Sequence, residues 1–200
     1  MKNKTVFLTL ALLLACVFTM NAYAELTALL GKKVLMIIPS KNFRDEELSI
    51  PKLMLLNNGA EVHVASISLK PVTGMLGSTV EPDLAIGDIK VEDYDAIVFV
   101  GGSGAAAYWD DPRAHKIAKE SVEQGKLLCA ICIAPVILAR AGVLEGENAT
   151  VWKESYEHLE QGGATYTAGA VEVSGSIITA DGPMSAAAFG QAIIEHLIKD

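Results

Sequence analysis

The stretch Leu127–Leu144 reads LLCAICIAPVILARAGVL, and its pattern changes in the middle. The segment Lys126–Ile131 is apolar after its first residue and predicts a strand buried on both faces. The segment Ala134–Ala141 predicts a helix that ends before Gly142. Cys132 lies at the junction, where a sharp strand-to-helix turn would project its side chain above the sheet. The sequence therefore predicts a nucleophile elbow at Cys132.

The residues around this thiol support two interpretations. The N-terminus of the following helix would favour the thiolate and so lower the pKa of Cys132. Backbone N–H groups at the helix start and at Gly102 would then hold an oxyanion. Cysteine is also among the most often buried residues, so Cys132 fits a small apolar core residue equally well.

Strands and helices alternate along the rest of the chain. Continuous apolar or alternating runs predict strands, and 3.6-residue patterns with charged starts or glycine stops predict helices. The remaining expected strands are Lys33–Pro39, Glu61–Ser66, Asp95–Val100, Ala149–Trp152, Val171–Val173 and Ser176–Thr179. The remaining expected helices are Asp45–Asn58, which Pro51 should kink or delay, Pro112–Gln124 and Met184–Ile198. This order predicts an α/β fold with a mostly parallel sheet and helices on both faces.

Chemically distinctive residues follow three of the buried strands. Arg44, Asp45, Glu46 and Glu47 come after the first, the glycine-rich run 101–104 after another, and Cys132 after the third. Ligands of open α/β sheets bind beyond the carboxyl ends of the strands. If these strands are neighbours, an acid, a glycine loop and a thiol converge at one site.

The first residues have the pattern of a secretory signal peptide. Lys2 and Lys4 precede the apolar segment Val6–Phe18, and Ala22-Tyr23-Ala24 has the small-x-small form of a cleavage site. We therefore expect residues 1–24 to be a signal peptide and residues 25–200 to be a single domain in the periplasm or outside the cell. A lipoprotein signal with acylated Cys16 is the second alternative.

The charge of the chain limits its partners. The formal net charge is −8, and loss of Lys2 and Lys4 makes it −10. A charge of this sign argues against binding to nucleic acid or to an anionic membrane surface. We expect no integral membrane span after processing.

The two cysteines of the expected mature chain, Cys129 and Cys132, have the spacing of a redox pair. Strand alternation would place their side chains on opposite faces, which opposes a disulfide. A turn at Cys132 would break that alternation, so the redox pair stays an alternative.

These motifs together resemble the ThiJ/PfpI family, which includes deglycases, PfpI-type proteases and glyoxalases, within the class I glutamine amidotransferase-like superfamily. The resemblance covers Lys32–Asp200. It rests on VLMIIP, on Glu47-Leu48-Ser49-Ile50-Pro51, on VFVGGSGA, on AICIAP and on ITADGP. It implies a flavodoxin-like, doubly wound sandwich and a homodimer or larger homo-oligomer.

The resemblance also implies roles for four residues. Cys132 matches the reactive cysteine, and Glu47 matches the acid that hydrogen-bonds its sulfur. Gly102 and Ile133 match the backbone donors beside it. No cofactor and no metal are implied.

Three positions depart from the family pattern. Ile133 stands where PfpI-type proteases have a histidine, Trp152 aligns with a histidine of the deglycases, and Asp181 replaces an arginine. Peptidase activity is therefore the family activity least expected here. The first functional hypothesis is a glyoxalase- or deglycase-like enzyme that acts on small reactive carbonyls or their protein adducts. The alternative is a non-catalytic, cysteine-based oxidative-stress sensor or holdase chaperone.

Overall fold

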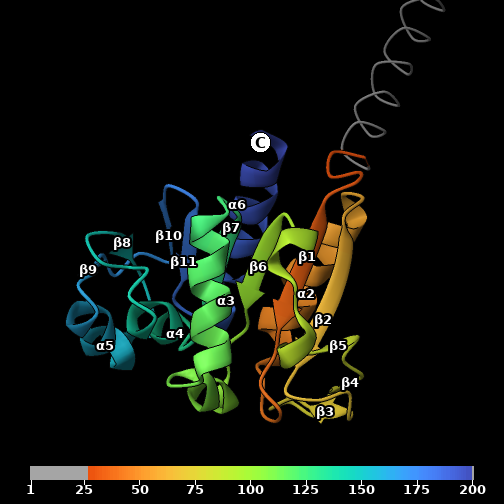
Figure 1. Ribbon diagram of the computed structural model, residues 1–200, viewed down its shortest axis with the longest axis horizontal. Coiled ribbons are helices and arrows are strands. Elements are labelled where there is room, and N and C mark those ends of the chain that lie inside the picture. Colours follow the sequence, from red (N-terminus) through yellow and green to blue (C-terminus); the bar gives the residue numbers. More distant parts are fainter. Residues whose placement is uncertain (1–26, 200) are drawn as a thin grey trace, which may run out of the picture.

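A computed structural model describes residues 27–199 of the chain. The expected signal peptide, its cleavage site and Cys16 lie outside the described residues. Figure 1 shows a central sheet with helices packed against it. Its strand order is β10-β11-β7-β6-β1-β2-β5, and all neighbours are parallel except β10 and β11. The predicted α/β class and its flavodoxin-like arrangement are confirmed.

The sheet strands share short, mostly buried apolar segments, and the helices connect them. The strands of this sheet are β1 (Lys33–Ile37), β2 (Glu61–Ser66), β5 (Leu84–Ala85), β6 (Ala96–Phe99), β7 (Leu127–Ile131), β10 (Val171–Ser174) and β11 (Ile177–Ala180). The helices are α2 (Asp45–Asn57), α3 (Pro112–Glu123), α4 (Pro135–Arg140), α5 (Tyr156–Gln161) and α6 (Ala186–Lys199). Two small sheets pair β3 (Val72–Thr73) with β4 (Thr79–Val80) and β8 (Asn148–Ala149) with β9 (Thr165–Tyr166).

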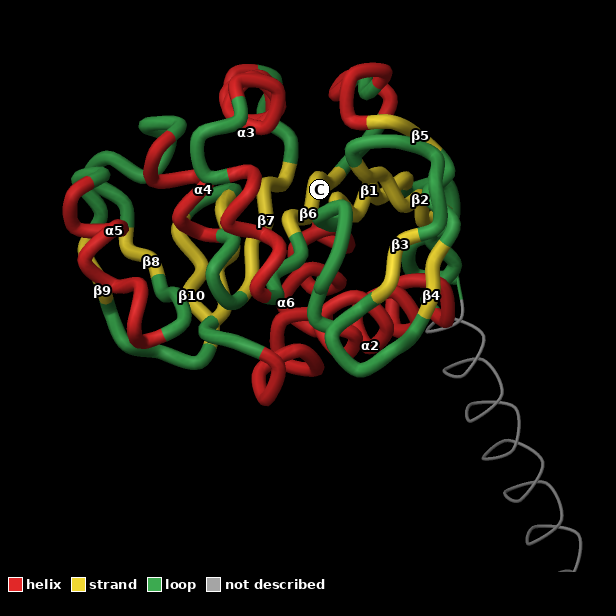
Figure 2. Tube along the Cα trace, turned by 90° about the horizontal axis from the view of Figure 1, so that it is seen from below, coloured by secondary structure: helices red, strands yellow, loops and turns green. Residues whose placement is uncertain are grey.

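The helices cover both faces of the sheet. Figure 2 shows α3 on one side and α2 with α6 on the other. Each strand contributes to both layers because its side chains alternate: Leu128 and Ala130 of β7 pack toward α3 and α4, whereas Leu127 packs toward α2 and α6. Full burial of one such leucine contributes about 1.5–3 kcal/mol. The continuous apolar runs of β1, β6 and β7 therefore form the core of both layers.

Pro51 neither interrupts its helix nor delays the start of the helix, which begins at Asp45. Helix α2 runs without interruption, and Pro51 is buried within it. Pro51 lacks only the N–H that would reach the carbonyl of Glu47, four residues earlier. Packing of α2 against α6 holds the rest of the helix in place.

The structure departs from the sequence prediction mainly in the connections. The expected strand Ala149–Trp152 is reduced to β8, and the last helix begins at Ala186 after a 3₁₀ turn. The segment between β2 and β6 contains β3, β4 and β5, which were not predicted. Among residues 27–199, no helix is long and apolar enough to cross a bilayer.

Candidate functional site

Cys132 follows β7 directly and has a φ of 64°, in the left-handed region that residues with a side chain rarely adopt. Two backbone hydrogen bonds hold this turn. The Cys132 N–H donates to the Ala180 carbonyl at 2.9 Å, and the Trp152 N–H donates to the Cys132 carbonyl at 2.8 Å. The backbone at Cys132 thus has the strained geometry expected of an elbow.

The acid and the thiol predicted from separate strand ends lie side by side. Strand β6 is flanked by β1 and β7, so the segments after all three strands meet at one edge of the sheet. A Cβ atom added at Gly101 would lie 2.5 Å from Oε2 of Glu47 and 2.6 Å from Cβ of Cys132. Only a glycine at position 101 allows this approach. Glu47 comes from the first turn of α2 and is completely buried.

Two backbone amides also face the thiol. The N–H groups of Gly102 and Ile133 point at the sulfur of Cys132 and favour its charged form. Gly102 has a φ of 93°, and its backbone approaches Arg44 too closely for a side chain. The structure therefore brings together all four residues that the family resemblance singles out.

Burial raises the pKa of Glu47 to about 7. The Cys132 thiol, the Gly101 amide and the Arg44 guanidinium oppose this rise only in part. The thiol and the Gly101 amide lie near the carboxyl, but neither carboxyl oxygen has a well-formed hydrogen-bond partner among the described residues. Glu47 is thus poised to take up and release a proton near neutral pH.

The pKa of Cys132 is raised, not lowered as the helix argument predicts. Burial is the largest cause, and the charge of Glu47 adds to it, bringing the pKa to about 12. The amides of Gly102 and Ile133 oppose the rise but do not cancel it. Helix α4 has only six residues, which limits its dipole. The thiol therefore needs a base to remove its proton, and Glu47 is adjacent.

A cavity of about 360 Å³ opens onto this pair. Its volume lies at the small end of the range for ligand pockets. Its walls come from α2, the β3–β4 hairpin, the glycine loop, the elbow and the segments after β8 and β11; the lining residues are Arg44, Glu47, Met75, Gly102, Ser103, Cys132, Ile133, Trp152 and Pro183.

Among the described residues, no histidine lines this cavity. His158 instead packs against Trp109, with ring centroids 5.0 Å apart and ring planes inclined at 57°. Trp152, at the position where the family resemblance implies a histidine in the deglycases, does lie in the cavity wall. Glu47 is the only carboxylic acid among the described residues that line the cavity, and it faces the sulfur of Cys132. No group of three or more potential metal ligands gathers within residues 27–199.

Sequence reasoning missed Met75 and Pro183 as lining residues, whereas Ser103 belongs to the glycine-rich run 101–104 that was expected at the site. The segment around Met75 reads Gly74-Met75-Leu76-Gly77, and its paired glycines are a turn signal. That signal indicates a turn but does not indicate where the turn packs.

Cys129 and Cys132 are both free. Strand alternation does not extend to Cys132, contrary to the sequence argument, because the elbow turns its side chain into the same apolar layer as Cys129. The two cysteines differ in environment: burial raises the pKa of Cys129 far above its ordinary value, whereas Cys132 borders the cavity and is 9% exposed.

Iodoacetamide is therefore expected to label Cys132 under native conditions and to leave Cys129 unmodified. Labelling of Cys129 requires local opening of the core, which costs several kcal/mol and slows the reaction by more than about a hundredfold. Peptide mapping without reduction checks both points. A Cys129–Cys132 cross-link, or faster labelling of Cys129, would contradict this assignment.

Comparison with known proteins places the site in a family. Residues 32–196 match the model of the DJ-1/PfpI family. A glutathione-independent glyoxalase of Caenorhabditis elegans is 30% identical over 166 residues, which cover 83% of this chain and 89% of that protein. A deglycase of Thermococcus kodakarensis is 32% identical over 148 residues, covering 74% and 89%. The crystal structure of a ThiJ/PfpI domain protein from Brachyspira murdochii has a TM-score of 0.83 and 33% identity, covering 85% of this chain and 99% of that one. The chain belongs to the DJ-1/PfpI family.

Proposed function

We propose that the protein is a glyoxalase- or deglycase-like enzyme in which Cys132 attacks a small reactive carbonyl and Glu47 carries the proton. The observation that carries the proposal is the contact between this thiol and a fully buried carboxyl whose pKa is raised to about 7, at the base of a cavity of about 360 Å³. Relatives named glyoxalase and deglycase support this reaction class.

In the proposed first step, the sulfur of Cys132 bonds to the aldehyde carbon of a dicarbonyl such as methylglyoxal. The ionised Glu47 takes the thiol proton as the bond forms, because a thiol with a pKa of about 12 is not ionised at neutral pH. The amides of Gly102 and Ile133 are placed to stabilise negative charge beside the sulfur.

In the second step, Glu47 first passes the thiol proton to the oxygen of the former aldehyde, which gives a hemithioacetal and leaves Glu47 ionised again. Glu47 then accepts the hydrogen of the former aldehyde carbon as a proton and returns one to the neighbouring carbon. The adduct becomes a thioester, and water then releases lactate and the free thiol. One carbon is oxidised and its neighbour is reduced, so methylglyoxal and water give lactate without an external oxidant or reductant.

The test of this proposal is lactate formation from methylglyoxal by the parent protein at about neutral pH, where Glu47 populates both protonation states. We expect turnover without glutathione or added metal. The absence of any lactate above the uncatalysed rate, in folded protein with a free Cys132, would overturn the proposal.

A second candidate function is oxidation sensing at the same sulfur. The two amides that face Cys132 would also hydrogen-bond an oxidised sulfur. Intact-mass measurement after peroxide titration distinguishes the two: a sensor gains oxygen on Cys132 but forms no lactate from methylglyoxal.

The protein is expected to lack general peptidase activity. Ile133 occupies the position of the protease histidine, and no histidine of the described residues lines the cavity. A Cys–His pair is what activates the thiol in cysteine proteases. Release of casein fragments that depends on Cys132 would contradict this expectation.

We also propose that the protein is exported and begins at Glu25. The motivation is the apolar segment followed by Ala22-Tyr23-Ala24. N-terminal sequencing of protein from its native host checks this, and an intact Met1 or an acylated Cys16 would contradict it.

A further inference from the structure

Met75 reaches the thiol cavity from a segment far from the other site residues in sequence. It lies in the turn between β3 and β4, a hairpin near the carboxyl ends of the parallel strands in Figure 1. Its side chain lines the cavity and is 44% exposed, so it forms part of the boundary between the cavity and solvent. Methionine is unbranched and flexible, so a rigid wall at this position requires that its backbone be held.

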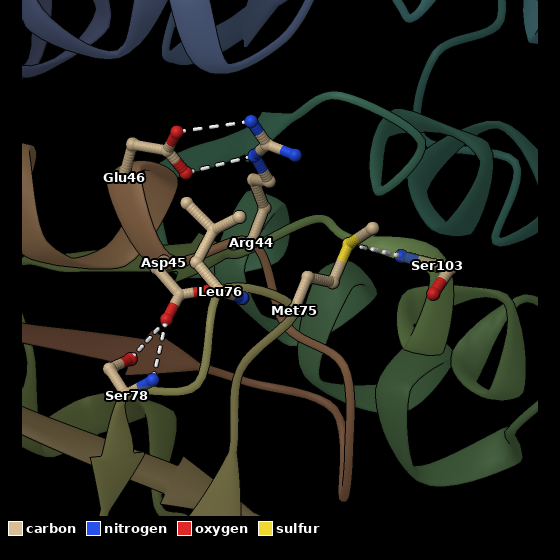
Figure 3. A network of polar contacts seen from close by, with 7 residues as sticks. All are labelled: Arg44, Asp45, Glu46, Met75, Leu76, Ser78 and Ser103. Carbon is tan, nitrogen blue, oxygen red and sulfur yellow. Dashed lines mark hydrogen bonds and ion pairs between the residues drawn. The ribbon is translucent and has the colours of Figure 1, made fainter.

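Asp45 provides this support. Its carboxylate accepts hydrogen bonds from the N–H of Leu76 at 2.7 Å and the N–H of Ser78 at 3.0 Å, and also from the Ser78 hydroxyl. Figure 3 shows the carboxylate of Asp45 close to Leu76 and Ser78. A Cβ added at Gly74 would lie 2.6 Å from both carboxyl oxygens, so the turn packs directly on Asp45. Burial raises the pKa of Asp45, but these hydrogen bonds together outweigh it and leave the pKa below its ordinary value.

Two further contacts fix Met75 itself. Its N–H donates to the carbonyl of Phe43 at 2.9 Å. Its sulfur accepts a weak hydrogen bond from the N–H of Ser103 at 3.5 Å, which Figure 3 shows as a dashed line between the two residues. Met75 is thus held by the segment before α2 and by the glycine loop after β6. Asp45 lies two residues before Glu47, so the first turn of α2 both supports the segment that carries Met75 and carries the acid Glu47.

We propose that Met75 is the specificity-determining residue of the thiol cavity, where it limits the size of the compound that reaches Cys132, and that Asp45 is the positioning residue that holds it there. The inference deepens the proposed function, because the compound it selects would be the carbonyl substrate. The expected substrates are dicarbonyls with small alkyl groups, and aromatic dicarbonyls are disfavoured.

The first test measures alkylation of Cys132 by a small reagent, iodoacetamide, and by a bulky aromatic maleimide. Met75→Ala is expected to raise the ratio of the bulky to the small rate about tenfold, equivalent to relief of about 1.4 kcal/mol in the barrier. Met75→Leu keeps the size and the backbone hydrogen bond to Phe43 and loses only the weak contact of the sulfur with Ser103, so its ratio is expected to stay close to that of the parent. Met184→Ala is the matched control, because Met184 is 96% exposed and does not line this cavity. An unchanged ratio in Met75→Ala, or no reaction of Cys132 with either reagent in any variant, overturns the proposal.

The second test concerns the positioning residue. Asp45→Asn retains one acceptor oxygen and loses the charge, so the turn is expected to loosen and the bulky-to-small ratio to rise threefold or more, on the order of 0.7 kcal/mol. Asp111→Asn is the control: Asp111 caps α3 and also accepts hydrogen bonds, but it lies outside the cavity. If Asp45 has a purely structural role, Asp45→Asn and Asp111→Asn will both lower the unfolding temperature, and neither will change the bulky-to-small ratio. That outcome would overturn the assignment of Asp45 as a positioning residue.

Turnover provides a third comparison, in which Met75→Ala is expected to raise kcat/KM for phenylglyoxal relative to methylglyoxal. The alkylation ratios do not depend on turnover, so they test the role of Met75 even if the protein converts neither dicarbonyl. Failure of turnover with a changed alkylation ratio therefore contradicts the proposed function alone. Turnover with an unchanged ratio contradicts the role of Met75 alone.

Discussion

Cys132→Ser is expected to reduce methylglyoxal turnover to the uncatalysed rate, a loss of at least about a thousandfold. A hydroxyl at the elbow is a far weaker nucleophile than a thiol, and Glu47, with a pKa of about 7, is too weak a base to activate it fully. The measurement is lactate production at saturating methylglyoxal, together with a thermal melt to show that the variant is folded.

Cys129→Ala is the matched control for this variant. Cys129 is completely buried in β7 and does not line the cavity, so its replacement is expected to cost some stability and to leave turnover within about twofold. Residual activity of Cys132→Ser comparable to the parent would show that the reaction does not use the thiol.

Glu47→Gln is expected to stabilise the fold above neutral pH while it abolishes turnover. In the parent, the folded-state pKa of about 7 lies above the ordinary value of 4.5, so the folded state holds its proton more tightly than the unfolded state. The contribution of Glu47 to the free energy of unfolding is therefore fully present at low pH, below about 4.5, and is lost as the pH rises through about 7. One pKa unit corresponds to about 1.4 kcal/mol, so the loss amounts to about 3 kcal/mol.

Glu47→Gln has no carboxyl at this position to ionise, so its free energy of unfolding should not show this fall with rising pH. Urea unfolding is expected to give similar free energies for Glu47→Gln and the parent at about pH 4, and a higher one for the variant, by about 3 kcal/mol, at about pH 8.5. Cys132→Ser retains Glu47, so its free energy of unfolding should decline with rising pH as that of the parent does. An equal pH dependence in Glu47→Gln and the parent would show that Glu47 is not buried as described.

The parts of the site carried by regular elements were predictable from the sequence. The apolar runs of β1 and β7 predicted parallel strands with functional residues after their carboxyl ends, and the strand order of the structure brings Glu47 and Cys132 to one edge of the sheet. The elbow was predictable because a strand pattern changes to a helix pattern at Cys132. Gly101 and Gly102 were recognised as a turn, and the structure shows that this turn lets the acid reach the thiol.

Other features depend on tertiary contacts that leave no periodic signal. Strands β3 and β4 have two residues each, which is too short for alternation to be detected, so the position of Met75 was not predicted. The direction of the Cys132 pKa shift was predicted wrongly because the prediction considered only one neighbour of the thiol, the N-terminus of the following helix. Burial and the charge of Glu47 are properties of the packed site, and together they outweigh the helix and the backbone amides.

The central claim is that Cys132 forms the bond to the carbonyl and that Glu47 moves the protons. Intact-mass measurement of Glu47→Gln mixed with methylglyoxal, with lactate assayed in the same sample, tests this claim most directly. The variant is expected to gain the mass of one methylglyoxal on Cys132, more slowly than the parent, because loss of the Glu47 charge removes one cause of the raised Cys132 pKa and water can then take the thiol proton. It is expected to form no lactate above background, because the later proton transfer between the two carbons has no base. Lactate formation at the parent's rate, or turnover by the parent without any adduct on Cys132 in the variant, would contradict it.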